Sequence, residues 1–185
     1  MNNIIKKLNL GSGNDIKDGY VNIDFKQSQG VDVVHDLNKF PWPFADKTFN
    51  EIIAENVVEH LDNFVLTMEE IHRISQSDAL IKISVPYWNS SYAYIDPTHK
   101  RGFHEHTFSF FDPDSDYCKE RFYYSNARFK IKSFSFIIAP FAPYFVLPFM
   151  KNIEIKNKIL IKIVGILGNL FSNIILELRM ELKRV

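Results

Sequence analysis

The chain has 185 residues, and its 22 lysine and arginine residues balance 22 aspartate and glutamate residues, so its formal net charge is zero. This length suits a single domain with a substantial core, and the balanced charge disfavours nucleic acid as a partner. The only cysteine, Cys118, excludes an internal disulfide framework. Because residues 1–7 also lack the apolar run of an export signal, the composition predicts a cytoplasmic protein.

The N-terminal half is organised around residues 8–24, with the sequence LNLGSGNDIKDGYVNID. An apolar strand leads into a Gly-Ser-Gly turn, and a second strand at residues 20–23 ends at the carboxylate of Asp24. Ligands of open parallel sheets bind at the carboxyl ends of the strands. The glycines let backbone approach a ligand closely, and an acidic residue in this position suits the two hydroxyls of a ribose. The segment therefore predicts a nucleotide-type site.

A dinucleotide site is the competing interpretation of this turn. Its fingerprint is G-x-G-x-x-G followed by an acidic residue about 20 positions further on. Here Ile16 stands at the third glycine's place, and Asp24 comes well before that distance. The spacing therefore disfavours a nicotinamide dinucleotide.

Five further strands are predicted by β-branched or alternating apolar residues, and one helix by an apolar stripe. The strands span residues 31–34, 51–54, 80–85, 127–136 and 176–183, and the helix spans residues 63–75. The last strand alternates most clearly, which predicts a half-exposed strand that ends the sheet. Strands that alternate with helical or loop crossovers indicate an α/β fold with a parallel sheet.

The links between the first three strands are unusually short. A βαβ crossover takes at least about 10–12 residues, whereas residues 14–19 and 25–30 offer about half of that. Neither link can hold a helix. One edge of the sheet should therefore lack its usual cover, and we expect a later segment or a second subunit to hide its apolar surface.

Residues 137–174 form an apolar segment. Pro140, Pro143 and Pro148 exclude a regular helix throughout its first part, whereas residues 153–172 have the pattern of a helix with a narrow polar stripe. Polar residues interrupt this run before it reaches the roughly 20 apolar residues of a membrane span. We expect the helix to cover the bare sheet or a second subunit, as in a homodimer. Weak contact with a membrane surface is the alternative.

Taken in order, these segments resemble the class I methyltransferases that use S-adenosylmethionine, especially small members found with surface-polysaccharide genes. The likeness covers residues 8–86 closely and rests on LNLGSG, YVNIDF, DVVHDLNKFPWPFADKTFNEIIAENVVEHL, MEEIHRI and IKISVPY. It implies one domain over residues 1–185. It also implies a Rossmann-like, mostly parallel seven-stranded sheet with shortened first crossovers and an antiparallel last strand. Residues 86–128 would form an acceptor-side insertion.

The resemblance assigns binding roles for S-adenosylmethionine to ten residues. These are Leu10, Gly11, Ser12, Gly13, Asp24, Phe25, Asp36, Leu37, Glu55 and Asn56. The glycine turn would face the methionine part and Asp24 the ribose hydroxyls. Asp36 would accept the adenine amino group beside the backbone N–H of Leu37, and the backbone after the fourth strand would meet the methionine ammonium. The alternative for Asp36 is a cap for the turn before Asn38.

The chemistry of methyl transfer requires little more than alignment of an acceptor and exclusion of water. A base helps when the acceptor is a hydroxyl. Residues 96–106 follow the fifth strand and resemble the family's DPTH stretch, which implies His99 as the base and Asp96 as the group that orients it. The alternative is that both residues only stabilise a loop. We expect O-methylation of a small molecule or glycan intermediate, with a non-catalytic cofactor-binding or interaction module as the alternative.

Two further groups of side chains lie near this stretch. His99, His104 and His106, with Asp96 and Glu105, offer metal-ligand chemistry, but their spacing matches no common zinc pattern, so we expect no metal ion. His60 is interpreted as the start of the helix after it. Four aromatic residues suit either stacking on an acceptor or plain packing, namely Tyr87, Trp88, Tyr92 and Tyr94.

Overall fold

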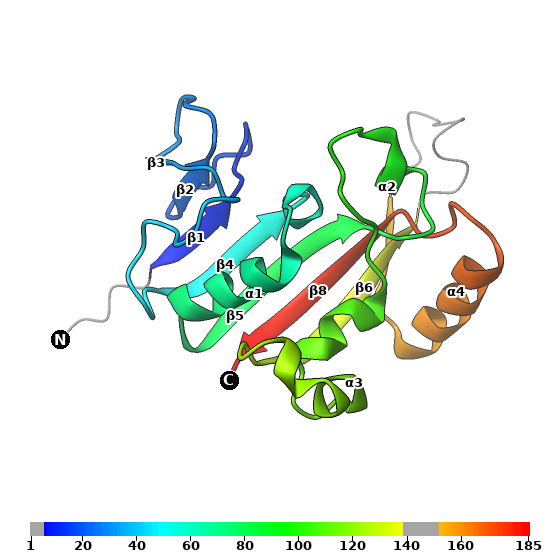
Figure 1. The fold of residues 1–185 in the computed structure, drawn as a ribbon. Coiled ribbons are helices and arrows are strands. Elements are labelled where there is room, and N and C mark those ends of the chain that lie inside the picture. Colours follow the sequence, from blue (N-terminus) through cyan, green and yellow to red (C-terminus); the bar gives the residue numbers. More distant parts are fainter. Residues whose placement is uncertain (1–5, 139–151) are drawn as a thin grey trace.

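The computed structural model describes residues 6–138 and 152–185, and eight strands form one sheet in the order β3-β2-β1-β4-β5-β8-β6-β7 (Figure 1). The strands are β1 (Lys7–Leu10), β2 (Val21–Asp24), β3 (Val33–Val34), β4 (Phe49–Glu55), β5 (Ser75–Pro86), β6 (Phe129–Ile138), β7 (Ile153–Ile155) and β8 (Glu177–Arg184). Strands β1 to β5 are parallel, and β8 runs antiparallel between β5 and β6. The predicted α/β class with a mostly parallel sheet and an antiparallel last strand is confirmed, with β7 as an additional strand.

Strand β8 lies inside the sheet, so the prediction that it ends the sheet is wrong. Its alternation is as expected, because Leu178 and Met180 are buried while Arg179 and Glu181 are exposed. Strand β8 is half-exposed because one face of the sheet is uncovered, and not because β8 lies at the edge of the sheet. The alternation of apolar and polar residues along the sequence is the same for an edge strand and for an interior strand with one uncovered face.

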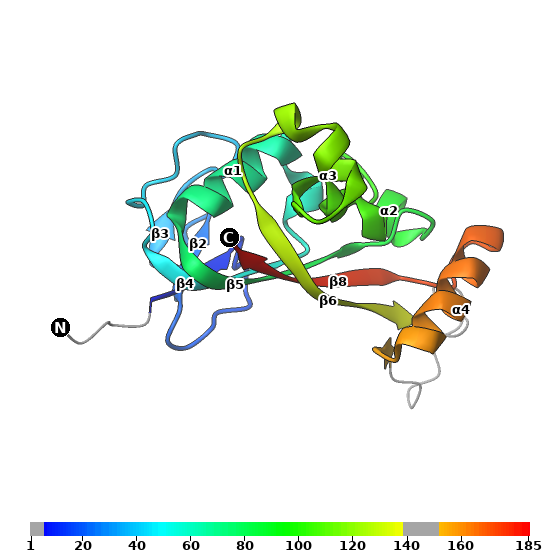
Figure 2. The same ribbon diagram turned by 90° about the horizontal axis from the view of Figure 1, so that it is seen from below.

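The other face of the sheet carries the helices α1 (Phe64–Ile74), α2 (Tyr92–Ile95) and α3 (Asp116–Glu120) (Figure 2). Helix α1 begins where the side chain of Asn63 accepts a hydrogen bond of 3.1 Å from the backbone N–H of Leu66. Its apolar stripe, including Met68 and Ile71, is buried against the strands. The predicted helix over residues 63–75 is therefore confirmed with its caps at each end.

An aromatic cluster joins α1 to the segment after β5. The ring of Phe64 meets those of Phe103, Phe108 and Phe111 edge-on, at centroid distances of 5.0, 5.5 and 5.8 Å. Such pairs contribute about 0.5–1.5 kcal/mol each beyond their buried area. The 3-10 helix η2 (Glu105–Phe111) packs against α1 and also contacts β6, so it belongs to the cover of this face of the sheet.

The opposite face is bare, because the links after β1 and β2 contain no helix (Figure 2). The side chains that it exposes are charged and paired across strands. Glu51 on β4 accepts from Lys7 on β1 at 3.0 Å and from Lys82 on β5 at 2.7 Å. The expectation that this surface is apolar and must be hidden is wrong, since charged side chains at alternate positions let it face water.

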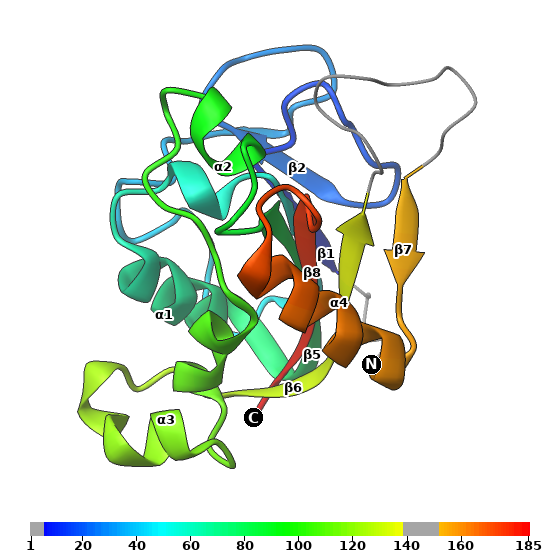
Figure 3. The same cartoon turned by 90° about the vertical axis from the view of Figure 1, so that its right-hand side faces the viewer.

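Helix α4 (Lys158–Leu170) also departs from the expectation that it covers the bare face. It lies beside the β6–β8 end of the sheet (Figures 1 and 3), and its contact side is lined by Gly165 and Gly168 next to Phe136 and Ile175. Six of its apolar side chains are exposed, namely Ile159, Leu160, Ile163, Ile166, Leu167 and Leu170. The prolines of the predicted cover segment 137–174 lie outside the described residues. Every described helix is too short to cross a membrane.

The ion pairs of the bare face predict a pH-dependent contribution to stability. Burial acts to raise the pKa of Glu51, but hydrogen bonds from Lys82, Lys7 and Tyr20 outweigh burial and hold that pKa below its usual value. A lowered folded-state pKa means that the stabilisation is present above the unfolded-state pKa and is lost as pH falls through the folded one. We therefore expect Glu51→Gln to lower the free energy of unfolding by about 1 kcal/mol at pH 7.

Urea unfolding at a series of pH values measures this difference. The gap between wild type and Glu51→Gln should close as the medium becomes acidic, and a gap that stays constant with pH would contradict the assignment. Asp18→Asn is the matched control, because Asp18 is exposed and lies outside the ion pairs. It should change the free energy of unfolding by less than about 0.5 kcal/mol.

Candidate functional site

The glycine turn after β1 has two glycines with positive φ that differ in their surroundings. At Gly11 (φ 58°) an added Cβ would lie 2.5 Å from a methyl group of Val57, in the segment that follows β4. At Gly13 (φ 51°) no described atom lies within 4 Å of such a Cβ. Gly11 therefore packs the turn against the segment after β4, whereas Gly13 leaves open space for a ligand.

The carboxylate of Asp24 is held at the end of β2 by backbone donors. Its Oδ2 accepts from the N–H of Gly13 at 2.9 Å, and its Oδ1 accepts from the N–H of Lys26 at 2.9 Å. The parallel register of β1 and β2 pairs Leu10 with Ile23, which brings the turn and the carboxylate together. Each carboxylate oxygen has a second lone pair for another donor. Asp24 is thus fixed beside the turn and still able to accept from a ligand hydroxyl.

Two side chains near Asp24 are available to a ligand. The hydroxyl of Ser12 is buried and has no hydrogen-bond partner among the described residues, although buried polar groups normally have one. The ring of Phe25 is 76% exposed at the carboxyl end of β2. An orphaned hydroxyl and an exposed aromatic face are suited to a ligand that combines polar groups with a flat ring.

Asp36 caps the turn before Asn38, as the alternative interpretation of this residue expected. Its Oδ1 accepts from the backbone N–H of Asn38 at 3.0 Å, while its Oδ2 lies 3.9 Å from the ammonium of Lys39. The neighbouring Leu37 is buried, and its carbonyl accepts from the indole N–H of Trp42 at 3.0 Å. The turn is therefore rigid, and the half-exposed carboxylate of Asp36 keeps room for a further donor.

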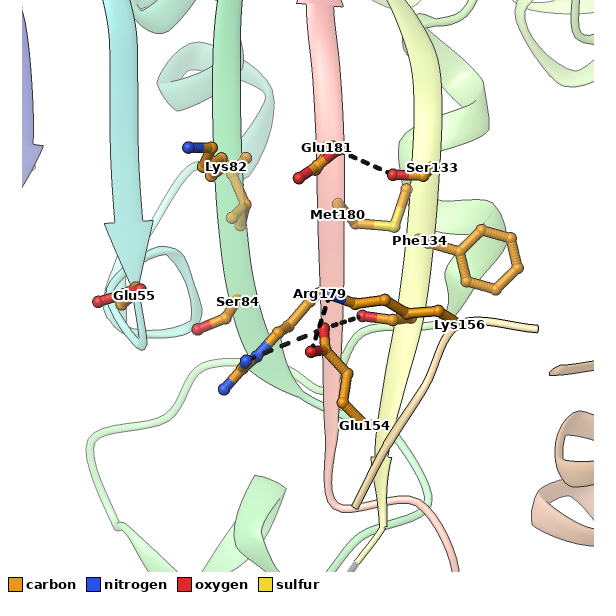
Figure 4. Close-up of a pocket in the computed structure, with 12 residues that line it drawn as sticks. Glu55, Lys82, Ser84, Ser133, Phe134, Glu154, Lys156, Arg179, Met180 and Glu181 are labelled. Carbon is orange, nitrogen blue, oxygen red and sulfur yellow. Dashed lines mark hydrogen bonds and ion pairs between the residues drawn. The ribbon is translucent and has the colours of Figure 1, made fainter. Parts of the chain in front are cut away.

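Glu55 is the last residue of β4, and Asn56 follows the strand. The carboxylate of Glu55 pairs with the ammonium of Lys17 at 3.0 Å, and its side chain points toward the bare face (Figure 4). Asn56 has a positive φ of 52°, and its N–H donates to the carbonyl of Ser84 at 2.9 Å. The side chain of Glu55 therefore does not lie at the turn, and only the backbone here suits a ligand.

A groove of about 370 Å³ lies on the bare face, apart from the glycine turn (Figure 4). Its walls carry Glu55, Lys82, Ser84, Ser133, Ser135, Glu154, Lys156, Arg179 and Glu181. Several of these groups satisfy one another: the hydroxyl of Ser135 donates to Glu154 at 2.8 Å, and that of Ser133 donates to Glu181 at 2.9 Å. The groove is a solvated, internally paired surface and not the site that the sequence predicts.

Two histidines meet at the carboxyl end of the sheet, one from each of two segments. His60 ends the 3-10 helix η1 (Val58–His60) after β4, and His99 follows α2. Their ring centroids are 4.6 Å apart with planes at 70°. The Nδ1 of His99 lies 3.3 Å from the carbonyl of Ala93, which fixes its orientation.

Asp96 orients His60 and not His99, which corrects the predicted pairing. Its carboxylate accepts from the backbone N–H of Thr98 at 2.8 Å and from the Thr98 hydroxyl at 2.6 Å. The Thr98 oxygen in turn lies 2.8 Å from the Nδ1 of His60. Burial, and next the nearby His99, lower the pKa of His60 and outweigh the raising effect of Asp96, so this imidazole is neutral near pH 7.

Glu59 is a functional candidate that the sequence analysis missed. It is fully buried, and burial is the main cause that raises its pKa to about 7. Neither carboxylate oxygen has a hydrogen-bond donor among the described residues. Only His60 was interpreted, as the start of a helix, but the signal was present: a Glu-His pair stands shortly after the carboxyl end of a core strand.

No protein-family model and no curated protein sequence matches the chain. Solved structures do match it, at low sequence identity. A SAM-dependent methyltransferase from Archaeoglobus fulgidus superposes with a TM-score of 0.63 at 19% identity, over 98% of this chain and 87% of that one. The chain has the class I methyltransferase fold. The likeness inferred from the sequence motifs is confirmed at this level.

Two other solved structures share the methyltransferase fold with this chain. A SAM-dependent methyltransferase from Thermotoga maritima matches with a TM-score of 0.58 at 10% identity, over 95% of this chain and 81% of that one. The [4+2]-cyclase SpnF matches with a TM-score of 0.54 at 10% identity, over 97% of this chain and 74% of that one. Because a cyclase appears among the matches, the methyltransferase fold alone does not decide the reaction.

The two glycines of the turn make different predictions for stability. Gly11→Ala combines a left-handed backbone with a clash against Val57 and should lower the free energy of unfolding by about 2–4 kcal/mol. Gly13→Ala meets only the backbone penalty, about 1 kcal/mol. Urea unfolding of both variants measures the difference, and equal losses would contradict the described contact between the turn and Val57.

Proposed function

We propose that the protein is an S-adenosylmethionine-dependent methyltransferase whose cofactor lies over the glycine turn. The observation that carries the proposal is the carboxylate of Asp24, fixed by Gly13 and Lys26 beside an open space and next to the orphaned hydroxyl of Ser12. A ribose has two adjacent hydroxyls that donate to one carboxylate, and a methionine part has polar groups for the buried turn. The residues present therefore suit this cofactor.

The roles of the binding residues are proposed from their positions. Leu10, Gly11, Ser12 and Gly13 would face the methionine part, with the backbone of Glu55 and Asn56 near its ammonium. Asp24 would accept from the ribose, and the exposed ring of Phe25 and the turn at Asp36 and Leu37 would flank the adenine. The short first crossover removes a helix N-terminus from this place, a smaller loss for a sulfonium ligand than for a phosphate.

The bound cofactor would supply a methyl group on a positive sulfur, which passes to an acceptor lone pair as the carbon–sulfur bond breaks and its electrons return to sulfur. The protein's own task is to align the acceptor and to receive its proton. We place this proton on the Nε2 of His99, because its Nδ1 faces the carbonyl of Ala93 and is therefore the protonated nitrogen. Asp96 would be a positioning residue, because it holds Thr98, and Thr98 holds the ring of His60 beside His99.

The acceptor is proposed to be a small molecule or glycan intermediate that is methylated on oxygen. Tyr92 and Tyr94 are 42% and 73% exposed on α2, which lies beyond the tip of β5 (Figure 1), so their rings can stack on a sugar or an aromatic acceptor. Trp88 and Tyr87 are less exposed, and the hydroxyl of Tyr87 donates to Glu105 at 3.0 Å. These two residues serve packing.

A non-catalytic module of the same fold is the second candidate, and the outward apolar side of α4 favours it. Ile159, Ile166 and Leu170 are 71%, 62% and 69% exposed, which is unusual for aliphatic side chains on one helix. The predicted homodimer and the predicted weak membrane contact both concern this surface and stay predictions, as does the cytoplasmic location. Cofactor binding without turnover would select this second candidate.

Asp24→Asn tests cofactor binding. The amide keeps the shape of the side chain but removes the charge that a ribose would use, so affinity for S-adenosylmethionine in titration calorimetry should fall roughly ten- to a hundred-fold. Glu181→Gln, which also replaces a carboxylate by an amide but lies on the bare face, should leave the affinity for S-adenosylmethionine unaltered. Wild type that gives no heat with millimolar ligand, while folded by circular dichroism, would overturn the proposed function.

His99→Ala tests the proton acceptor. Loss of a general base should lower kcat by about 10²- to 10⁴-fold while the affinity for the cofactor changes little. Transfer of labelled methyl from S-adenosylmethionine to a panel of hydroxylated sugars and phenols provides the measurement. His106→Ala, a change at an exposed histidine of the same segment, is the control. Parallel loss of turnover and cofactor affinity in His99→Ala would show a structural role instead.

A further inference from the structure

A cluster of three ligand-type side chains stands where the segment after β4 meets the loop after α2. One ligand atom from each of Glu59, His60 and His99 lies within 4.8 Å of the other two. We propose that these three side chains bind a divalent transition-metal ion. The site joins two segments that are about 40 positions apart in the sequence, which is why spacing alone gives no metal pattern.

The carboxylate of Glu59 is the observation that points to a cation. The residue is 0% exposed, and both of its carboxylate oxygens lack a donor among the described residues. Burial of a polar group without a partner costs roughly 1–3 kcal/mol, and more for a charged one. A cation bound between the carboxylate and the imidazoles would remove this penalty.

Both imidazoles present a free nitrogen of the kind that binds metal. The Nδ1 of His99 faces the carbonyl of Ala93, which only accepts, so Nδ1 carries the hydrogen. The hydroxyl of Thr98 donates to Asp96, so its oxygen accepts from the Nδ1–H of His60. Each ring therefore keeps its lone pair on Nε2. Metal-binding histidines in proteins characteristically donate their other N–H to a carbonyl or a carboxylate-linked group in this way.

The backbone holds the two segments together without any ion. The N–H of Lys100 donates to the carbonyl of Glu59 at 2.8 Å, and the guanidinium of Arg101 donates to the carbonyl of Asp62 at 2.8 Å. The three side chains are thus brought together by protein contacts. A tetrahedral ion with bonds of about 2.1 Å sets its ligand atoms about 3.4 Å apart, so modest side-chain rotation completes the site.

The neighbouring cluster of His104, Glu105 and His106 has the same residue types, but its carboxylate and the ring of His104 have partners within the protein. Glu105 accepts from the hydroxyl of Tyr87 at 3.0 Å, and the Nδ1 of His104 accepts from the N–H of His106 at 3.2 Å. The bond from His106 caps η2, and the bond from Tyr87 gives the carboxylate of Glu105 a partner. The two clusters therefore differ in one respect: only the cluster of Glu59, His60 and His99 holds a buried carboxylate without a hydrogen-bond partner among the described residues.

The ligand set selects the class of ion. Two imidazoles and one carboxylate suit iron(II), cobalt(II), nickel(II) and zinc(II), whereas magnesium and calcium prefer oxygen ligands. Three protein ligands leave at least one coordination position for an exogenous oxygen. The site is therefore of the open type, able to bind a water or a hydroxyl group.

The role of the ion in methyl transfer rests on the proposed function, whereas its binding does not. An acceptor hydroxyl in the open position would have a lowered pKa. Its proton would leave to solvent, its oxygen would form the bond to the methyl carbon, and the electrons of the carbon–sulfur bond would return to sulfur. A coordinated Nε2 cannot also receive a proton, so the base role proposed above for His99 would then apply only to the metal-free protein, which should methylate more slowly than the metal-loaded protein.

Titration of tag-free, chelator-treated protein with cobalt(II) tests the binding directly. Visible absorption bands of a low-symmetry nitrogen–oxygen site should appear and saturate at one equivalent. Zinc(II) should displace cobalt and raise the melting temperature, and magnesium should do neither. Absence of saturable bands up to millimolar cobalt would overturn the proposal.

Variants identify the ligands. Glu59→Gln, His60→Ala and His99→Ala should each weaken cobalt binding roughly ten-fold or more, and His106→Ala should leave it unchanged. Thr98→Val removes the partner of the His60 Nδ1–H without removing a ligand, and should weaken binding by about ten-fold. This variant decides the matter if an alanine variant does not fold. Equal cobalt affinity in wild type, Glu59→Gln and Thr98→Val would refute the assignment.

Calorimetry with S-adenosylmethionine on the same preparations separates this inference from the proposed function. Cofactor binding without cobalt bands would refute the metal site and leave the methyltransferase proposal standing. Cobalt bands that depend on Glu59 without cofactor binding would confirm the metal site and refute the methyltransferase proposal.

Discussion

The short links after β1 and β2 are the constraint on which the rest of the molecule depends. With no room for a helix, they leave one face of the sheet to water, and the ion pairs around Glu51 make that exposure tolerable. All packing of α1 and of the segment after β5 then falls on the other face. That segment must both cover the sheet, through η2, and supply the loop that carries His99.

The arrangement of the candidate site follows from this difference between the covered and the uncovered face of the sheet. The glycine turn and Asp24 need only two neighbouring parallel strands, so they form in spite of the missing crossover helices. The histidine pair needs the segment after β5 to return over the end of β4, and hydrogen bonds from Lys100 and Arg101 hold it there. One half of the site is therefore local in sequence, and the other half is made by a long-range contact.

This difference explains what the sequence could predict. The seven predicted strands, the glycine turn and helix α1 follow from local patterns and were found, whereas the short strand β7 lies within residues that were predicted as helix. The interior place of β8, the outward apolar side of α4 and the contact of Thr98 with His60 depend on neighbours that are distant in the sequence. Glu59 was missed because a buried carboxylate without a partner is visible only in three dimensions. Alternation in β8 was found correctly, but it does not distinguish an open edge from an open face.

The bare face also has a thermodynamic consequence. A sheet covered on both sides withdraws apolar surface from water on each of them, and that withdrawal dominates the heat-capacity change of unfolding. Here one side already faces water in the folded protein, so its unfolding exposes little additional apolar surface. The stability curve of this protein should therefore be flatter, with a weaker dependence on temperature for each residue, than that of a doubly covered relative of equal length.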